Sequence, residues 1–422
     1  MGEFTFLNEK YQAPRWSGEY VDCSMPMTFD TYSNCWFGCL YCFATFQRWI
    51  WKTKDNYVRK NVKAIDFNKI ERMFKDPDKY WWQFKDYIKQ RLVMQWWWMS
   101  DPMCPIEEEW EIGLKLLKLF NELKYPVRFS TKSDLVLRDH RYLDEFAKWA
   151  DHFAYMSSII TYDPKIAEKL EARTPTPQRR MEVLKTLTDL WVWTVIRLRP
   201  YIIGITDKTV KDIVEAGWKA HVKALSTEAL CLDTRMTELT RAKFAELSKL
   251  CWFDIVKFYK QNSNTIWYLR LSREFLRPYM DELAHLCAEN NIKVAVSCPK
   301  HKERTFWYSC CWLPTEWVLG NTHKGQYMYA IMVAKEKWEV HWSDIEKHSI
   351  FGNVMMRNAQ WFNKWTCKKE AKIWDLTLKD MLHILWNDPK RANSPYKLFE
   401  WVLLPHGLDE NWDVIYRYNP RA

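Results

Sequence analysis

The run Asn34-Cys35-Trp36-Phe37-Gly38-Cys39-Leu40-Tyr41-Cys42-Phe43 spaces three cysteines as C-x3-C-x2-C, with an aromatic residue before the third. Three thiolates on one short loop can bind three irons of a [4Fe–4S] cluster and leave the fourth iron open to a small molecule. Residues 26–32, just before the loop, have the composition of a β-strand. The triplet therefore follows a strand end, where α/β barrels carry their chemistry.

Two other interpretations of the triplet compete with a cluster. Zinc usually takes cysteines as two C-x2-C pairs, and no matching pair lies near residues 35–42. A disulfide framework suits a secreted chain, whereas this chain starts Met-Gly-Glu-Phe-Thr-Phe, without a basic and then apolar signal region. Zinc or plain structural cysteines remain the alternatives to an iron–sulfur site.

The triplet resembles the signature of the radical S-adenosylmethionine (SAM) enzymes. The resemblance implies that Cys35, Cys39 and Cys42 bind the cluster and that SAM chelates its open iron. It also implies reductive cleavage of SAM to a 5′-deoxyadenosyl radical, which takes hydrogen from a substrate, with flavodoxin or ferredoxin as reductant. The backbone around Tyr41 is expected to meet the adenine, while the cofactor carries the difficult chemistry.

Later strand ends look like the spore photoproduct lyase-like branch of that family. The pieces are Met99-Ser100-Asp101-Pro102, Ser130-Thr131-Lys132-Ser133, Ser157-Ser158, and then Glu171, Arg179 and Arg180. The resemblance implies that Lys132 and either Ser157 or Ser158 bind SAM. Ser100 and Asp101 are further cofactor-binding candidates, and Asp101 could hydrogen-bond the ribose or the substrate. A cation and a hydroxyl suit a carboxylate and a ribose. Asp101 has a second interpretation, as the cap of the following helix.

Two arginines and one cysteine are further candidates. Arg197 and Arg199 alternate along the fifth strand, so one face of it should present them to SAM or to a substrate anion, unless they form a structural ion pair. The resembled branch uses a cysteine as hydrogen donor, and Cys104 lies on a loop where it could act so. Cys104 does not match the position used by that branch, so repair of spore photoproduct itself is not supported.

Strand-like and helical segments alternate along most of the chain, which predicts parallel strands with helical crossovers. The expected strands are residues 26–32, 91–95, 127–132, 153–160, 194–200, 221–226 and 293–297, and the expected helices are 107–123, 139–149, 176–189, 207–217, 236–248 and 278–290. The fold class is α/β: a partial (β/α)6 TIM-like barrel of about six strands with a C-terminal α+β appendage. The predicted domains are a lead-in (1–24), the core barrel (25–300) and the appendage (301–422).

Length and composition are those of a globular protein. The chain has 422 residues, 48% hydrophobic and 27% charged, and no apolar run reaches the ~18 residues of a membrane span. The twelve cysteines are mostly scattered, which favours a reducing, cytoplasmic setting. The formal net charge of +10 allows an anionic partner such as nucleic acid, or is spread over solvated faces.

A second cysteine group follows the last expected strand. Cys298, Cys310 and Cys311, with Cys231, Cys251 or His301, could bind an auxiliary Fe–S cluster or zinc. Adjacent cysteines chelate one metal poorly, so buried thiols are the alternative.

The chain is unusually rich in tryptophan and poor in glycine. There are 27 Trp and 10 Gly, whereas about 7% Gly, or roughly 30 residues, is usual. Several Trp occupy segments where turns need glycine: Trp36, Trp96–Trp98, Trp191, Trp193, Trp312 and Trp412. We hypothesise that many are glycines of a gene in which UGA encodes glycine. The alternative is an unusually Trp-rich protein.

The substrate is not evident from the motifs. The branch resemblance, the basic charge and the segment 48–60, with its interleaved Lys, Arg, Trp and Tyr, favour a nucleic acid or nucleotide. A peptide or small metabolite, with an auxiliary cluster at Cys298, Cys310 and Cys311, is the main rival. A zinc-stabilised, non-catalytic nucleic-acid-binding module is the third hypothesis.

Overall fold

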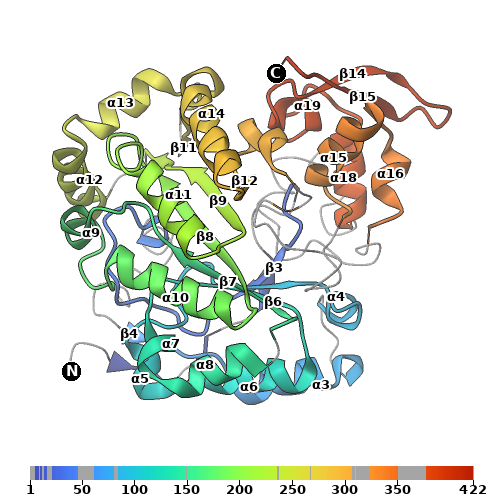
Figure 1. The fold of residues 1–422 in the computed structure, drawn as a ribbon. Helices are drawn as coiled ribbons and strands as arrows, with labels where there is room; N and C mark the ends of the chain where they lie inside the picture. Colours follow the sequence, from blue (N-terminus) through green and yellow to red (C-terminus); the bar gives the residue numbers. More distant parts are fainter. Residues whose placement is uncertain are drawn as a thin grey trace.

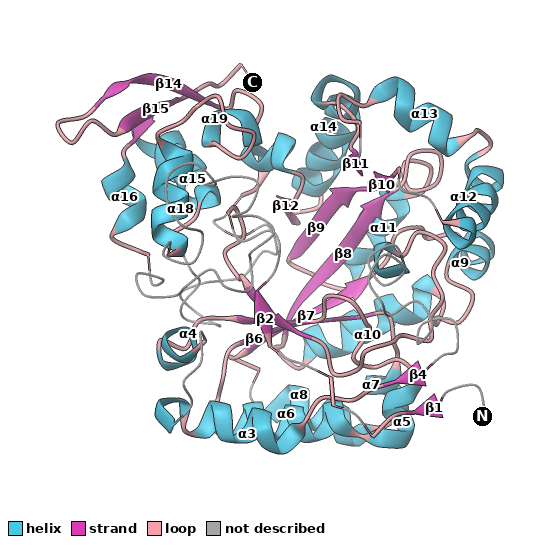
Figure 2. Cartoon of the chain, turned by 180° about the vertical axis from the view of Figure 1, so that it is seen from behind, coloured by secondary structure: helices cyan, strands magenta, loops and turns pink. Residues whose placement is uncertain are grey.

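The computed structural model describes residues 5–8, 10–11, 14–16, 21–45, 61–79, 84–148, 150–234, 237–266, 268–306, 309, 324–349 and 377–421. An eight-stranded sheet forms its centre, in the order β12-β9-β8-β7-β6-β5-β3-β2 (Figures 1 and 2). The strands are β2 (Arg15–Trp16), β3 (Met27–Phe29), β5 (Met94–Trp96), β6 (Val127–Thr131), β7 (Phe153–Ser158), β8 (Trp193–Tyr201), β9 (Ala224–Ala229) and β12 (Lys293–Val296). Neighbouring strands are parallel except for β2, which runs antiparallel to β3.

Helices connect the parallel strands and cover one face of the sheet (Figure 1). They are α3 (Phe67–Lys75), α4 (Lys85–Lys89), α5 (Ile106–Trp110), α6 (Ile112–Leu123), α7 (Leu135–Arg138), α8 (His140–Lys148), α9 (Pro164–Leu170), α10 (Pro177–Asp189), α11 (Val210–Lys219), α12 (Glu238–Cys251), α13 (Ile255–Asn262) and α14 (Arg273–Glu289). Side-chain caps start several of them, because an oxygen at the N-cap accepts a backbone N–H that the helix leaves unbonded. The caps Thr176, Thr237 and Ser272 begin α10, α12 and α14 in this way.

The two faces of the sheet differ in side-chain size. Toward the helices, large residues such as Phe129, Tyr155 and Ile196 join the main apolar core. On the inner face a separate cluster of mostly small residues packs, namely Cys23, Met25, Val93, Ala154, Met156, Val195, Ala224 and Ala295. Because side chains alternate between faces along a strand, small inner residues leave room at the strand ends for a site.

The C-terminal part forms a small α+β appendage, coloured orange to red in Figure 1. It contains α15 (Tyr327–Lys337), β13 (Glu339–Val340), α16 (Trp342–Glu346), α18 (Leu378–Trp386), α19 (Pro395–Leu398), β14 (Leu403–Leu408) and β15 (Val414–Tyr418), with strand order β13-β15-β14. The Tyr327 N–H donates to the Val21 carbonyl over 3.0 Å, and Lys302 pairs with Asp22 at 2.9 Å. The appendage therefore starts directly against the lead to β3.

Short elements complete the described part. These are β1 (Thr5–Phe6) with β4 (Asn61–Val62), β10 (Leu232–Asp233) with β11 (Tyr268–Leu269), and the 3-10 helices η1 (Pro77–Lys79) and η2 (Pro299–Arg304). No helix in the described ranges is long and apolar enough to span a membrane.

The α/β fold with a mostly parallel sheet and an α+β appendage is confirmed. The structure has seven parallel strands, one more than the number expected for a (β/α)6 barrel, and β12 is the last. The helix expected over residues 107–123 is two helices, because Glu111 adopts a left-handed conformation with φ 51°. The predicted domain boundaries stay predictions.

Candidate functional site

Local hydrogen bonds shape the cysteine loop after β3. The Cys42 N–H donates to the Cys39 carbonyl over 3.3 Å, and the Leu40 N–H donates to Leu170 over 3.0 Å. Gly38 has φ +63°, a conformation that glycine adopts without strain. The Lys243 ammonium donates to the Cys39 carbonyl over 3.1 Å and to the Thr45 hydroxyl over 3.0 Å. The loop is therefore fixed at its centre rather than only at its ends.

The three thiols lie in one electrostatic environment. Burial raises the pKa of Cys39, the Lys132 ammonium opposes this, and the Glu171, Cys42 and Cys35 side chains raise it further. The Cys104 side chain raises the pKa of Cys35 well above its ordinary value, and burial adds to the effect. Without a metal, Cys35 and Cys39 are protonated thiols. A bound metal reverses the preference, because it favours the thiolate outright.

A buried chain of polar groups holds Tyr41, between the second and third cysteines. The Tyr41 hydroxyl donates to Glu171, and the Arg180 guanidinium donates to the same carboxylate over 2.6 Å. Arg180 also donates to the Ser158 carbonyl over 2.5 Å. Arg180 and Glu171 are almost fully buried, so this ion pair is shielded from water. The network ties the cysteine loop to the end of β7.

Asp30, the residue directly after β3, organises the loop after β5. Its buried carboxylate accepts the backbone N–H groups of Trp98, Met99 and Ser100 over 2.7, 2.8 and 3.2 Å. Arg15 pairs with the other oxygen of Asp30. The carboxylate therefore positions the 98–100 loop beside the triplet.

Asp101 joins the same loop to β6. It accepts from the Thr131 hydroxyl over 2.6 Å, and from the N–H groups of Lys132 over 2.8 Å and Met103 over 3.0 Å. Burial raises the pKa of Asp101, while Lys132 and these hydrogen bonds lower it. Asp101 thus places the backbone of Lys132.

The buried Glu107 carboxylate connects four segments behind the cysteine loop. Its carboxylate accepts from the hydroxyls of Tyr32 (2.5 Å) and Tyr142 (2.7 Å) and from the N–H groups of Gly113 (2.8 Å) and Leu114 (2.8 Å). A Cβ at Gly113 would meet this carboxylate at 2.9 Å, so glycine is required there. Glu107 fixes the start of α6 against the segment that leads into the triplet.

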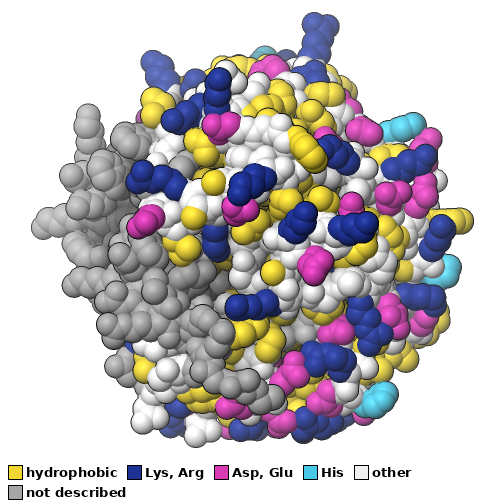
Figure 3. Space-filling view, turned by 90° about the vertical axis from the view of Figure 1, so that its left-hand side faces the viewer, with side chains coloured by type: hydrophobic (Ala, Val, Ile, Leu, Met, Phe, Trp, Pro, Cys, Tyr) yellow, Lys and Arg dark blue, Asp and Glu magenta, His cyan; other side chains and the backbone are white. Residues whose placement is uncertain are grey.

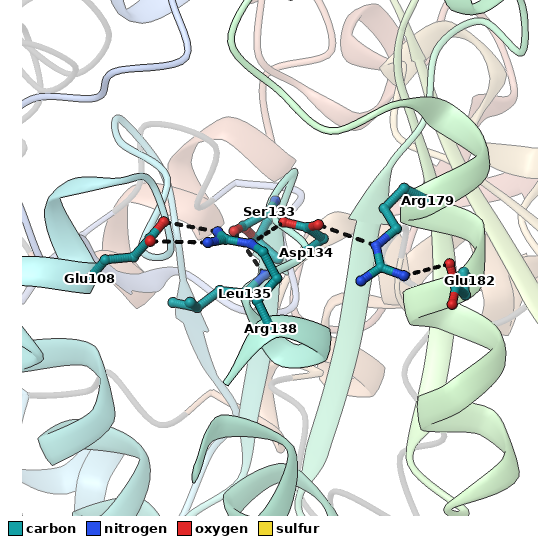
Figure 4. Close-up of polar contacts among 8 residues, drawn as sticks. Glu108, Ser133, Asp134, Leu135, Arg138, Arg179 and Glu182 are labelled. Atoms are coloured by element: carbon teal, nitrogen blue, oxygen red, sulfur yellow. Dashed lines mark hydrogen bonds and ion pairs between the residues drawn. The ribbon is translucent and has the colours of Figure 1, made fainter. Parts of the chain in front are cut away.

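A surface network braces the turn after Lys132 (Figure 4). Arg138 contacts Glu108 (2.8 Å) and Asp134 (2.8 Å), while Arg179 contacts Asp134 (3.3 Å) and Glu182 (2.7 Å). The two arginines link α5, α7 and α10 around one aspartate. Arg179 therefore lies in this network and not with Arg180 at Glu171.

A cavity of about 190 Å³ lies at the carboxyl ends of the strands. One side is lined by the triplet loop and the other by residues from β8, β9 and the segment after β11. The lining residues are Cys23, Cys39, Tyr41, Cys42, Phe43, Gln95, Trp97, Trp98, Lys132, Arg197, Arg199, Pro200, Glu228, Ala229, Leu230, Cys231, Tyr268 and Arg270. Among these are four cationic side chains and a single carboxylate.

Lys132 and Arg197 both lie against the aromatic ring of Trp97. The Lys132 ammonium lies 5.2 Å and the Arg197 guanidinium 4.0 Å from the Trp97 ring centre. Burial lowers the pKa of Lys132, but the nearby Cys39, Glu171 and Asp101 raise it, and the net direction is upward. Lys132 therefore stays a buried cation beside the triplet, as a partner for a carboxylate must.

The structure separates the two serine candidates. In the β6–β7–β8 register, Ser158 lies opposite Arg197 and Ser157 opposite Ile196. Ser158 is therefore on the inner face, in the row of Arg197, whereas Ser157 is on the helix face with Tyr155. Both hydroxyls are buried without a hydrogen bond among the described residues. Ser158 is the better placed candidate.

Three other candidates lie behind the cavity wall. Ser100 donates from its hydroxyl to the Tyr32 carbonyl, and Asp101 binds β6 as above. Cys104 is fully buried against Cys35. None of the three is among the described residues that line the cavity. Their binding and hydrogen-donor roles stay predictions, and their positions are those of supporting groups.

The predicted auxiliary site is only partly within the described ranges. Cys298 is buried near Arg270 and Glu228, with its pKa raised by burial. Cys310, Cys311 and the basic aromatic segment 48–60 lie outside the described residues. No group of three or more Cys, His, Asp or Glu in the described ranges is arranged to bind a single metal ion.

The triplet fits a cluster better than a single ion. A [4Fe–4S] cluster places each protein sulfur on a different iron, so the three sulfurs need not share one coordination sphere. Cys39 and Cys42 line the cavity, and Cys35 belongs to the same electrostatic group. The cavity also presents cations for a carboxylate, of which Lys132 is buried. The donors present thus suit a cluster with an exchangeable ligand.

Surface charge on one face is mixed. The side shown in Figure 3 has Lys and Arg scattered singly among Asp and Glu rather than gathered in one patch. On that face the +10 excess is spread over a solvated surface. The concentration of positive charge described here is inside the cavity.

No protein-family model and no curated protein matches the chain. Among solved structures, the fold is similar to spore photoproduct lyase complexed with dinucleoside spore photoproduct, with 12% identity, a TM-score of 0.49, and coverage of 68% of this chain and 79% of that chain. Another is Streptococcus suis SuiB bound to S-adenosylmethionine, with 15% identity, a TM-score of 0.44, and coverage of 65% and 51%. These are likenesses of fold, and the chemistry rests on the residues of this chain.

Sequence reasoning missed several residues of the site. Asp30, Lys243, Glu228 and Arg270 were not singled out, although each contacts the loops or lines the cavity. Asp30 carried a signal, since a carboxylate directly after a buried strand is costly unless it is bonded. Lys243 and Arg270 carried none, because each reaches the site from a distant segment.

Proposed function

We propose that the protein is a radical SAM enzyme, in which Cys35, Cys39 and Cys42 bind a [4Fe–4S] cluster. The observation that carries the proposal is the shared cavity: two of the three cysteines line it together with four cationic side chains, of which Lys132 is buried, and cations suit the SAM carboxylate. When bound, the cluster supplies one electron for the reductive cleavage of SAM.

The chain's own residues bind and orient the cofactor in this proposal. Lys132 and Arg197 provide positive charge for the SAM carboxylate, and Ser158 provides a hydroxyl on the same face. Tyr41, fixed by Glu171, holds the loop that meets the adenine. Burial of the site keeps water from the reactive atoms.

The substrate proposed is a nucleotide or nucleic acid, and the reaction begins with hydrogen abstraction. Support comes from the cationic cavity and from Tyr268, whose exposed ring lies 5.4 Å from Arg270 and can stack on a base. A low-potential flavodoxin or ferredoxin is the proposed electron donor. An auxiliary cluster at Cys298, Cys310 and Cys311 belongs to the rival proposal, a peptide or small-metabolite substrate.

Anaerobic reconstitution tests the proposal. Iron, sulfide and reductant should give a brown protein with about four irons per chain, as for one [4Fe–4S] cluster. SAM and dithionite should then yield 5′-deoxyadenosine. A colourless protein that releases no 5′-deoxyadenosine would contradict the proposal, and tight zinc binding in its place would favour a zinc module.

A further inference from the structure

Six tryptophans have the backbone conformation of glycine. Twelve non-glycine residues in the described ranges have a positive φ, and half of them are tryptophans. They are Trp97 (122°), Trp191 (65°), Trp252 (67°), Trp338 (69°), Trp401 (71°) and Trp412 (66°). Tryptophan makes up 27 of 422 residues, so fewer than one would be expected among twelve. A bulky residue in this region is uncommon, whereas glycine enters it freely.

Four of the six stand at turn positions that favour glycine. Trp191 follows α10, and the next N–H, of Val192, bonds back to Leu187 over 3.0 Å, as in a Schellman motif. Trp252 and Trp338 are the left-handed C-caps of α12 and α15. Trp412 lies in the turn between β14 and β15, where its N–H donates to Asp409 over 3.0 Å.

The indoles at these turns are largely in water. Trp191 is 90%, Trp252 84% and Trp412 79% exposed. An exposed indole gains nothing from burial, so packing does not offset the backbone conformation.

Other tryptophans behave in the opposite way. Trp96 is fully buried, donates from Nε1 to the Thr31 hydroxyl over 2.9 Å and packs on Phe129 at 5.0 Å. Trp386 is fully buried and donates to the Val414 carbonyl over 2.6 Å. Neither has a positive φ. At both positions the indole is buried and its N–H is hydrogen-bonded. Trp36 and Trp193, suspected from the sequence, also lack a positive φ.

Trp97 brings the same backbone conformation into the cavity. Its φ of 122° is the furthest of the six from ordinary values, and its buried ring lies 5.2 Å from the Lys132 ammonium and 4.0 Å from the Arg197 guanidinium. Those cations are the ones available to the SAM carboxylate. A glycine at position 97 would open the space that the indole now occupies beside Lys132 and Arg197.

We infer that the working protein carries glycine at these six positions and tryptophan at Trp96 and Trp386, as when a gene uses both UGA, read as glycine, and UGG. The consequence at position 97, an open SAM site, rests on the proposed function. The assignment of glycine at the six turns does not.

The gene and the protein made in its own cells test the assignment. We expect UGA at the six codons and UGG at positions 96 and 386, and peptides from the native protein should have masses that fit glycine only at the six. UGG at the six codons would overturn the inference. UGA at all eight positions would contradict the structural division between the two groups.

Adjacent substitutions test the consequence for the site. Trp97 is itself buried, so Trp97→Gly should lower the thermal midpoint, but by less than Trp96→Gly, because glycine relieves the backbone at φ 122°. It should raise SAM affinity of the reconstituted protein by about tenfold or more, since the indole no longer competes for the space. Trp96→Gly is the matched control and should lower the midpoint sharply through a core cavity. Equal destabilisation by both would overturn the inference at position 97. Cluster colour is recorded in the same samples. A colourless protein would count against the proposed function, whereas a brown protein with unchanged SAM affinity would count against the inference at position 97.

An independent observation concerns the other end of the cavity. Glu228 lies between two guanidiniums, 3.8 Å from Arg199 and 3.9 Å from Arg270. The distance to Arg270 exceeds hydrogen-bond length, so the Glu228 carboxylate does not bind the Arg270 fork directly. Nη1 of Arg270 has no hydrogen bond among the described residues. The aromatic ring of Tyr268 lies beside it.

We infer that Arg199 and Arg270 bind a phosphate of the substrate and that Tyr268 stacks on its base, which rests on the proposed function and names a nucleotide as the substrate class. Planar guanidiniums match phosphate oxygens in pairs. Glu228 competes with the phosphate, so the two charges have opposite effects on binding. A purely structural Arg–Glu–Arg cluster would not show opposite effects.

Binding of thymidine 5′-monophosphate to the reconstituted protein tests this site. Arg270→Gln should weaken binding by about tenfold or more, because a hydrogen bond to a charged group is lost, and Glu228→Gln should strengthen it. Arg417→Gln is the control, since Arg417 has an equally loose contact, 3.8 Å to Glu339, outside the cavity. No binding by the unmodified protein, or equal effects of the two arginine variants, would overturn the inference. Either result leaves 5′-deoxyadenosine formation as a separate readout.

Discussion

The two ends of the cavity are built differently. At the triplet end, buried groups make short contacts, such as Arg180 to Glu171 at 2.6 Å and Lys132 N–H to Asp101 at 2.8 Å. At the arginine end, the pairs of Glu228 with Arg199 and Arg270 are 3.8 and 3.9 Å long, and Arg270 is 27% exposed. Tight, buried networks pre-organise a site. The comparison indicates a fixed cofactor at one end and an adjustable ligand at the other.

The largest expected effect separates the cysteines of the two ends. Cys39→Ser should abolish cluster colour and 5′-deoxyadenosine formation, a larger loss than the roughly 10–100-fold that follows removal of an outer-shell partner. Cys298→Ser should leave both unchanged, with about four irons per chain. Iron analysis and product chromatography check this. A halved iron content in Cys298→Ser would show that the arginine end also holds a cluster.

Stability should distinguish the ion pairs. Arg180→Met leaves the buried Glu171 carboxylate uncompensated and should lower the free energy of unfolding by ~3–5 kcal/mol. Arg270→Met, at the loosely paired end, should cost about 1 kcal/mol or less. Urea unfolding of the two variants measures the difference. Similar losses would mean that the arginine end is as rigid as the triplet end.

Ligand affinity should depend on different cations at the two ends. Lys132→Met should weaken SAM binding by roughly 10–100-fold, the range of a lost hydrogen bond to a charged group. Arg270→Met should leave SAM binding unchanged, because Arg270 belongs to the other end. Equilibrium dialysis with labelled SAM is the measurement. If Arg270→Met weakened SAM binding as much, the division of the cavity would be wrong.

The smallest expected effect is a pH dependence behind the arginine end. Burial, and then the charges of Arg273, Arg304, Arg277 and Lys300, lower the pKa of His301 from 6.5 to about 3. The unfolded chain therefore binds a proton that the folded chain does not, and stability falls as pH drops below about 6.5. The loss should be about 2 kcal/mol between pH 7 and 5.

The substitution His301→Phe should make the stability of the protein less sensitive to pH in this range. His285→Asn is the matched control, because the His285 side chain is 72% exposed whereas His301 is buried. An unchanged profile in His301→Phe would show that other groups cause the acid sensitivity.

Local patterns in the sequence predicted the alternation of strands and helices and the triplet loop at a strand end. Runs of buried strand residues such as Phe153–Ser158 and capped helices such as Pro177–Asp189 carry their signal within a few neighbours. The left-handed Glu111, which divides one expected helix in two, has no such signal.

The partners of the candidate residues could not be predicted. Asp101 was a candidate for substrate or a helix cap, but it binds β6, because that contact depends on how strands pair. Ser157 and Ser158 were equivalent until the register with Arg197 separated them. Arg270 enters the cavity from the segment after β11, far along the chain. Such contacts are set by tertiary packing rather than by local pattern.

The two-residue strand β2 has a consequence for handling the protein. It lies at the edge of the central sheet (Figure 2), pairs antiparallel with β3 and so covers the sheet edge next to the triplet. Its Arg15 also bonds Asp30. An uncovered edge of a sheet is a template for association with other chains. Shortening the chain to begin at residue 21 should therefore promote aggregation, and an affinity tag is better placed at the other terminus.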